Sequence, residues 1–329
     1  MNKEEVQKDY LKNKHDHLKL AENLKHALEG FLVDNEISFH TVSFRIKEFE
    51  SYQEKIERKG YDDPIEQIED FCGLRIVCFY PTDLQRIAQV IAQEFDVIES
   101  IDKTGNFEPD RFGYRSHHYI VKIKEDWAKA PNYRNLENLK AEIQVRTILM
   151  HAWADIEHKL AYKKKEDIPI AFRRKLYQLS ALLEIADGQF QDLKNEKEDF
   201  RKSLISENKG VFEFDVMQDL NLDSLQAYLD FKFPRHSIAE KSTGDLLEEF
   251  IEYDISLEEF DKMCTEIEDI LPEVERKIRG KSWTLAQVGV ARLVLDLKSE
   301  AYWISRQGDF PSPEWKNVVK KMRSEFSKK

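Results

Sequence analysis

Two acidic residues lie beside apolar runs that are typical of buried β-strands. Asp70 comes shortly before the run 74–80, and Glu142 lies inside the run 139–146. A buried carboxylate is unfavourable unless it pairs with a base or binds a cation. Two carboxylates on separate strands can share one Mg²⁺, which takes few protein oxygens and fills its shell with phosphate oxygens. The pair therefore indicates a magnesium site that handles phosphate groups.

Basic side chains at helical spacing precede the first acid. We predict a helix over 44–59, in which Lys47, Ser51 and Lys55 come at every fourth residue and share one face. A row of ammonium groups around a hydroxyl suits a polyphosphate, and Arg45 lies where this helix begins. The alternative is an ordinary exposed helix, because acidic residues alternate with the bases.

Arg75 lies within the apolar run 74–80. An arginine in such a strand must reach solvent, pair with an acid or stack on a flat ring. One interpretation is a structural ion pair between Asp70 and Arg75. The other is that Arg75 forms part of a ligand site.

A third group of polar and aromatic residues follows a loop. Gly113 allows a close approach of the backbone to a ligand, and Tyr114 can offer its ring to a nucleobase. Arg115 and His118, at the start of a strand predicted over 116–123, are placed to meet phosphate groups. A plain turn into a strand explains the glycine but not the density of Tyr, Arg, Ser and His that follows it.

The strand that carries Glu142 continues into a helix rich in aromatic and basic residues. Glu142, Gln144 and Arg146 point to one face of the strand, because side chains alternate along it. The helix predicted over 147–163 adds His158 two turns further on. In the competing interpretation, the tryptophan of this helix is buried in the core and its lysines are exposed to solvent. Together the four groups suit phosphoryl transfer, where positioning and charge stabilisation supply most of the catalysis.

The elements that must position these residues alternate between strands and helices. Strands are predicted over 74–80, 97–101, 116–123 and 139–146, with helices over 83–95 and 147–163. This alternation is typical of an α/β layer arrangement. From about Ile170 onward the pattern is mainly helical. Further helices are predicted over 222–232, 243–252, 256–278 and 283–305, with one strand or an extended linker over 210–218. We expect one domain over 1–205 and a second over 206–329.

Composition limits the class of protein. The 329 residues carry 63 acids against 51 Lys and Arg, a net charge of −12 at pH 7, which argues against nucleic-acid binding through bulk charge. No apolar run approaches the ~20 residues of a membrane span, and no signal peptide is recognised. The three cysteines lack metal-ligand spacing and are expected to be core thiols. We therefore expect a cytoplasmic protein with no membrane partner.

Four motifs, in this order, resemble the synthetase domain of the RelA/SpoT family of alarmone synthetases. They are RIKEFESYQEK, DFCGLRIVCFY, GYRSHHY and EIQVRTILMHAWADIEHKLAYK, within about residues 40–165. The resemblance implies a nucleotidyltransferase-like α/β (α+β) fold, a mixed sheet flanked by helices. It implies transfer of the β,γ-pyrophosphate of ATP to the ribose 3′-hydroxyl of GDP or GTP, giving (p)ppGpp and AMP. Few residues precede Arg45, so we expect the small hydrolase-less type with an extra C-terminal domain.

The resemblance also implies roles for the residues on the ATP side. Arg45 and Arg75 would hold the adenine of ATP between them. Lys47, Ser51 and Lys55 would hold its phosphates. These assignments match the polyphosphate interpretation of the basic row.

The metal and the acceptor would be held by the remaining motifs. The resemblance implies that Asp70 and Glu142 bind Mg²⁺ and that Glu142 helps to deprotonate the attacking hydroxyl. Tyr114 would stack on the acceptor base. His118 and Arg115 would lie near the acceptor phosphates. By their neighbourhood, the remaining residues assigned to the acceptor side are Gln144, Arg146 and His158.

The chain departs from the family pattern at two acceptor positions. Many members have an Asn before the Gly-Tyr pair and a Lys two residues earlier, where this chain has Phe112 and Asp110. One alternative is therefore a toxic relative that pyrophosphorylates the 3′ end of tRNA, with bases between Lys159 and Lys175 meeting the RNA backbone. A second is a catalytically silent nucleotide-binding regulator. The C-terminal domain could form a homo-oligomer or bind an antitoxin-type protein.

Overall fold

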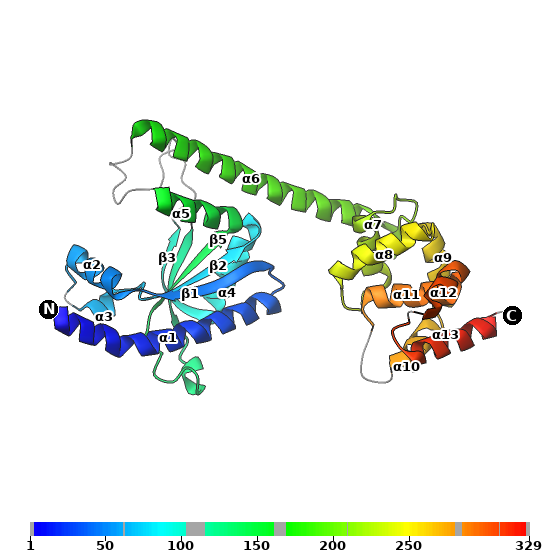
Figure 1. Cartoon of the computed structure of the whole chain (residues 1–329), viewed down its shortest axis with the longest axis horizontal. Helices are drawn as coiled ribbons and strands as arrows, with labels where there is room; N and C mark the ends of the chain where they lie inside the picture. The colour runs from blue at the N-terminus through cyan, green and yellow to red at the C-terminus, as the bar shows by residue number, and fades with distance from the viewer. Residues whose placement is uncertain are drawn as a thin grey trace. The chain divides into compact units, whose positions relative to one another are not determined.

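Two compact units make up the protein. The computed structural model describes residues 3–61, 63–102, 116–160, 169–208, 210–279, 285–308 and 310–326 (Figure 1). The first unit comprises Met1–Leu193 and the second Lys194–Lys329. The division lies within the long helix α6 (Ile170–Ser203), before the boundary expected after residue 205.

A five-stranded mixed sheet forms the frame of the first unit. Its strands are β1 (Phe39–Ile46), β2 (Cys72–Cys78), β3 (Phe95–Asp102), β4 (His117–Ile123) and β5 (Ala141–Thr147). Their order is β1-β2-β5-β4-β3, with β2 and β5 parallel and the other neighbours antiparallel. The flanking helices are α1 (Lys3–Asp34), α2 (Phe49–Lys59), α3 (Pro64–Gln67), α4 (Pro81–Glu94) and α5 (Ile148–Leu160). The predicted mixed sheet flanked by helices is confirmed.

The sheet has one packed face and one polar face, because side chains alternate along each strand. Leu74, Ile76 and Ile143 are buried in a single apolar cluster with leucines of α1 and aliphatic side chains of α4. Arg75 and Glu142, at intervening positions, belong to the other face. A slip of one residue would move the apolar set out of the core, so burial fixes the register. The core thereby determines which polar side chains share the opposite face.

β1 replaces the beginning of the helix predicted over 44–59. Val42 and Phe44 pack against the core, whereas Arg45 is exposed, which is the alternation of a strand. The helical prediction was wrong here because the four-residue spacing of the bases masked the two-residue apolar period. Arg45 therefore lies on a strand, and Lys47 lies between this strand and α2.

The second unit is mainly helical, as predicted. Its elements are β6 (Ile205–Asn208), β7 (Val211–Phe214), α7 (Leu222–Lys232), α8 (Glu240–Glu252), α9 (Leu257–Ile267), α10 (Leu271–Arg279), α11 (Gln287–Lys298), α12 (Glu300–Ser305) and α13 (Pro313–Phe326). The strand option over 210–218 is realised as β7, which pairs with β6. Tyr228, Phe250 and Phe260 are fully buried in its core, together with most of α11.

Two predicted helices of this unit are each divided in the structure. The helix predicted over 256–278 breaks between α9 and α10, where Pro272 occupies the first turn of α10, the position that tolerates a missing N–H. The helix predicted over 283–305 breaks at Ser299, whose hydroxyl accepts a hydrogen bond from the backbone N–H of Tyr302 at 3.3 Å. Helix α13 was not predicted.

The three cysteines are buried free thiols, as expected. Within the parts of the chain that the structure describes, every helix is too short or too polar to cross a membrane.

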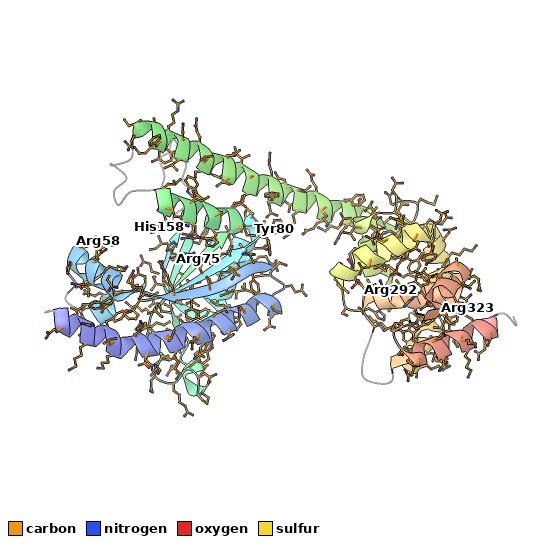
Figure 2. All side chains as sticks on the ribbon, in the orientation of Figure 1. Arg58, Arg75, Tyr80, His158, Arg292 and Arg323 are labelled. Atoms are coloured by element: carbon orange, nitrogen blue, oxygen red, sulfur yellow. The ribbon has the colours of Figure 1, made fainter. Side chains whose placement is uncertain are left out.

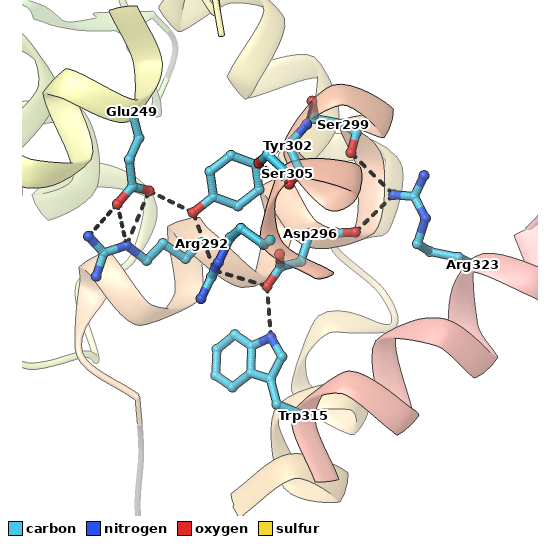
Figure 3. A network of polar contacts seen from close by, with 9 residues as sticks. Glu249, Arg292, Asp296, Ser299, Tyr302, Ser305, Trp315 and Arg323 are labelled. Atoms are coloured by element: carbon cyan, nitrogen blue, oxygen red, sulfur yellow. Dashed lines mark hydrogen bonds and ion pairs between the residues drawn. The ribbon is translucent and has the colours of Figure 1, made fainter. Parts of the chain in front are cut away.

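Helix α11 carries a buried carboxylate that is hydrogen-bonded to side chains outside this helix. Asp296 is fully buried, and its Oδ2 accepts a hydrogen bond from Trp315 Nε1 at 2.7 Å (Figure 3). The same oxygen accepts a second hydrogen bond from Arg306 Nη1 at 3.2 Å. Its Oδ1 has no hydrogen-bond partner among the described residues. Burial raises the pKa of Asp296 to about 6, against the opposing attraction of Arg306. The carboxyl therefore ionises less readily in the folded protein than in the unfolded chain.

Asp296→Asn should remove a pH dependence from the unfolding of the second unit. In the wild type the folded-state pKa lies above the unfolded one, so the contribution to stability is complete below about pH 4 and lost as pH rises through 6. That loss is about 3 kcal/mol for a pKa near 6. Urea unfolding of the full chain at several pH values, followed by tryptophan fluorescence, measures it. Equal pH slopes in wild type and variant would contradict the argument, and the exposed Asp269→Asn is the matched control.

Candidate active site

Two lysines hold the first predicted acid. Lys47 Nζ lies 2.9 Å from Asp70 Oδ2, and Lys55 Nζ lies 2.8 Å from Asp70 Oδ1. Burial acts to raise the pKa of Asp70, but the two ammonium groups outweigh it and the pKa is lowered. The carboxylate is therefore ionised and bridges two cations. The alternative ion pair between Asp70 and Arg75 is not the arrangement that forms.

An aromatic cluster places these lysines. Tyr10 of α1 and Phe71 pack against Tyr52 of α2, and the Tyr10 hydroxyl donates to the Lys47 carbonyl at 3.1 Å. The Lys47 N–H donates in turn to the Phe71 carbonyl at 2.9 Å, one residue from Asp70. The end of β1, the start of β2 and helix α2 are thus tied to one point, which brings together charges far apart in sequence.

The second predicted acid lies in a row of hydrogen bonds across the sheet. Glu142 Oε1 is 2.7 Å from His118 Nδ1, and Glu142 Oε2 accepts from Gln144 Nε2 at 2.8 Å. Arg146 Nη2 donates to Gln144 Oε1 at 3.0 Å. Burial acts to raise the pKa of Glu142, but the His118 and Gln144 hydrogen bonds outweigh it and the pKa is lowered. The prediction that Glu142, Gln144 and Arg146 share a face is confirmed.

Strand pairing sets this row beside a small cavity. Gln144 is paired with Arg75 on β2 and with His118 on β4, and Gly73 is paired with Glu142. The cavity, of about 150 Å³, is lined by Ser43, Phe44, Arg45, Gly73, Leu74, Arg75 and Gln144. A Cβ at Gly73 would lie 3.7 Å from Arg45 Cγ, so the missing side chain leaves room beside the arginine. The two arginines expected to hold adenine therefore line one cavity.

Three arginines crowd this face. Burial, which has the largest effect, and the neighbouring cations Arg75 and Arg45 together lower the pKa of Arg146 to about 10, although Asp155 and Glu142 oppose them. Arg146 Nε is buried without a hydrogen-bond partner among the described residues. Clustered guanidinium groups favour a planar or anionic ligand that accepts their hydrogen bonds.

Helix α5 adds two residues that the sequence interpretation missed. His151 Nδ1 lies 3.5 Å from Arg75 Nη1, and Asp155 Oδ1 lies 3.7 Å from the same atom. The two are one helical turn apart and face the sheet from the first turns of α5. Their separation of four residues could have indicated that His151 and Asp155 share one face of the helix. Their contacts with Arg75, however, depend on how the helix packs on the sheet. Ser116, 2.5 Å from His118 Nε2, was also missed.

Other predicted residues are less closely tied to this face. Ser51 is exposed on α2, one turn before Lys55, and His158 is exposed on α5. Figure 2 shows His158 along that helix and Arg75 among the strands. Tyr114 and Arg115, with the loop that precedes them, lie outside the described residues.

The two acids fit a magnesium ion that takes most of its ligands from a substrate. The charge of Asp70 acts against the lowering of the pKa of Glu142, so the two carboxylates share one electrostatic environment. Each of their four oxygens accepts one hydrogen bond from the residues named above, which leaves further lone pairs. Among the described residues no group of three or more His, Cys, Asp or Glu forms a metal cage. Mg²⁺ commonly binds one or two carboxylates together with phosphates and waters.

Known proteins are similar to this chain in sequence and in fold. Residues 44–167 match the family described as "Region found in RelA / SpoT proteins". The chain is 33% identical over 163 residues to GTP pyrophosphokinase YwaC of Bacillus subtilis, covering 48% of this chain and 74% of that protein. It is 28% identical over 198 residues to GTP pyrophosphokinase YjbM of the same organism, covering 58% and 90%. The crystal structure of small alarmone synthetase 1 from Bacillus subtilis aligns with a TM-score of 0.50 and 26% identity, over 58% of this chain and 99% of that one. The chain therefore belongs to the RelA/SpoT family and, like these relatives, is a transferase enzyme.

Proposed function

We propose that this chain transfers the β,γ-pyrophosphate of ATP to the ribose 3′-hydroxyl of GDP or GTP, producing (p)ppGpp and AMP. The observation that carries the proposal is a juxtaposition on one face of the sheet. The cavity lined by Arg45 and Arg75 includes Gly73, which is paired with Glu142 on the neighbouring strand. Asp70, held by Lys47 and Lys55, comes two residues before the start of β2. The relatives named GTP pyrophosphokinase support a guanosine nucleotide as the acceptor.

On the ATP side, the arginines bind the base and the lysines bind the phosphates. A guanidinium plane stacks on a flat aromatic ring. Arg45 and Arg75 both line the cavity, and the adenine ring of ATP is proposed to bind between them. Lys47 and Lys55 both form ion pairs with Asp70. Each ammonium group has further N–H donors for phosphate oxygens. Ser51, exposed on α2 one turn before Lys55, adds a hydroxyl to this set.

On the acceptor side, Glu142 takes the proton. The 3′-hydroxyl oxygen attacks the β-phosphorus of ATP, the bond from that phosphorus to the bridging oxygen of the α-phosphate breaks, and AMP leaves with the electron pair. The proton of the hydroxyl passes to the Glu142 carboxylate, which is ionised because its hydrogen bonds lower its pKa. Tyr114 and Arg115 are proposed to meet the acceptor base and phosphates.

Mg²⁺ is the proposed cofactor, and Asp70 and Glu142 are the residues that would hold it. When bound, the ion would neutralise charge on the phosphates and align them. The residues of the chain then orient ATP and accept the proton, as described above.

Arg75→Ala should weaken ATP binding with little effect on the chemical step. Stacking on a base contributes about 1–3 kcal/mol, so KM for ATP should rise about 5- to 150-fold. The adenine does not change during the reaction, so kcat should stay within about threefold of wild type. Steady-state kinetics at saturating acceptor measure both constants, with the exposed Arg58→Ala on α2 as control (Figure 2). A fall in kcat at unchanged KM would contradict the assignment of Arg75 to the base.

The acceptor can be identified by supplying candidates separately. Purified full-length protein with ATP and Mg²⁺ is mixed with GDP, with GTP or with deacylated tRNA, and the products are separated by ion-exchange chromatography. We expect AMP and a 3′-pyrophosphorylated guanosine nucleotide in the first two mixtures. Product in the tRNA mixture alone would replace the guanosine acceptor with RNA. Absence of AMP from all three would overturn the proposed function.

A further inference from the structure

A continuous row of hydrogen bonds supports Glu142 from both sides. On one side the Ser116 hydroxyl lies 2.5 Å from His118 Nε2, and His118 Nδ1 lies 2.7 Å from Glu142 Oε1. On the other side Gln144 donates to Glu142 Oε2, and Arg146 donates to Gln144. Ser116 and His118 are each 7% exposed, so water does not compete effectively for these contacts.

The chemistry of the groups fixes the direction of each hydrogen bond. An ionised carboxylate only accepts, so His118 Nδ1 must carry the hydrogen that it shares with Glu142. In the neutral imidazole the other ring nitrogen is then an acceptor, and the Ser116 hydroxyl must donate to it. Both ring nitrogens are engaged, so His118 in this arrangement has no free N–H for the acceptor phosphates, the role expected from its motif.

Strand pairing sets where the members of the row lie. Ser116 directly precedes β4, and the β4–β5 pairing places His118 opposite Gln144, next to Glu142. The imidazole therefore reaches one carboxylate oxygen while the Gln144 amide reaches the other. Each Glu142 oxygen keeps a lone pair outside these bonds, and the plane of the carboxylate is held by two donors.

We propose that His118 is a positioning residue for Glu142 and that Ser116, by its hydrogen bond to the other ring nitrogen, holds the His118 ring in the orientation that donates to Glu142. The proposal rests on the proposed function, in which Glu142 accepts the proton of the acceptor hydroxyl. Loss of such an outer hydrogen bond typically costs about 10- to 100-fold in activity. The effect should fall on kcat, because Ser116 and His118 support Glu142 and neither lines the cavity proposed for the ATP base.

Two substitutions of His118 separate the two ring nitrogens. In His118→Asn the side-chain amide nitrogen takes the place of Nδ1 and can still donate to Glu142. In His118→Gln the amide lies at the place of Nε2 and is too far from Glu142. We expect kcat within about threefold of wild type for the first and about 10- to 100-fold lower for the second, with KM for ATP unchanged in both. Equal kcat values for the two variants would overturn the positioning role.

Substitutions of Ser116 test the other end of the row. Ser116→Ala should lower kcat, and Ser116→Thr, which keeps the hydroxyl, should restore it. A Ser116→Ala protein with wild-type kcat would remove Ser116 from the proposal.

The tautomer can be measured without any turnover. In the full-length protein labelled with ¹⁵N at histidine, long-range ¹H–¹⁵N spectra distinguish Nδ1–H from Nε2–H, and His118→Asn identifies the His118 signal. We expect Nδ1–H in the wild type and also in Ser116→Ala, because the Glu142 carboxylate, which only accepts, sets the tautomer. A wild-type Nε2–H tautomer would overturn the proposal even if the enzyme is active. A wild type that shows Nδ1–H but forms no AMP would instead contradict the proposed function and leave the His118–Glu142 geometry supported.

Discussion

Glu142→Gln should reduce kcat by about 10²- to 10⁴-fold, the usual contribution of a general base. The amide has nearly the shape of the carboxylate but cannot take a proton from the attacking hydroxyl. The affinity for ATP should change little, because the base and phosphates contact other residues in the proposed complex. Kinetics with ATP and a guanosine nucleotide, together with calorimetric titration of a non-hydrolysable ATP analogue, measure the two effects separately.

The control for this variant is Glu125→Gln, an exposed glutamate of the same unit. It should retain wild-type kcat and melting temperature. If Glu142→Gln kept more than about a tenth of the wild-type kcat, general-base catalysis by Glu142 would be ruled out. Loss of ATP binding in parallel with kcat would instead assign Glu142 to the ATP side.

Replacing Lys47 and Lys55 together by methionine should lower kcat/KM for ATP by about 10²- to 10⁴-fold. Hydrogen bonds to charged groups contribute about 1.5–3 kcal/mol each, and this variant removes one from each lysine. The exposed Lys59→Met, on the same helix as Lys55, should behave like wild type. A double variant with an unchanged KM for ATP would exclude the lysines from phosphate binding.

The same double variant changes the behaviour of Asp70 with pH. In the wild type the lysines lower its pKa, so Asp70 contributes stability above the unfolded-state value, which is lost as pH falls through the folded-state value. Without the lysines only burial remains, and the pKa should rise. The difference in unfolding free energy between wild type and variant should therefore shrink below about pH 4. A constant difference would mean that the ion pairs do not hold Asp70.

The two parallel strands of the candidate site could be predicted because their composition is unambiguous. β2 and β5 are apolar runs with β-branched residues, and both formed within two residues of their predicted limits. β1 was missed because it is an edge strand with an exposed polar side, and its last residues overlap bases at helical spacing. The consequence is local: Arg45 reaches the cavity from a strand rather than from the start of a helix.

Contacts between segments far apart in the chain could not be predicted from the sequence. The spacing suggested that Lys47 and Lys55 bind phosphate, but it left Asp70 with either Arg75 or a metal as its partner. The structure pairs Asp70 with both lysines, because the aromatic cluster around Tyr10 brings the end of β1 beside the start of β2. The partners of His118 likewise depend on the β4–β5 register, which no local pattern encodes.

The fate of the β-phosphorus tests the central claim most directly. Full-length protein is incubated with Mg²⁺, GDP and ATP labelled with ³²P at the β-position, and the labelled species are separated. Intact pyrophosphate transfer predicts that the label leaves ATP only for the 3′-pyrophosphorylated nucleotide, with one unlabelled AMP for each product. Label in ADP or in free pyrophosphate, with none in the acceptor, would contradict the account.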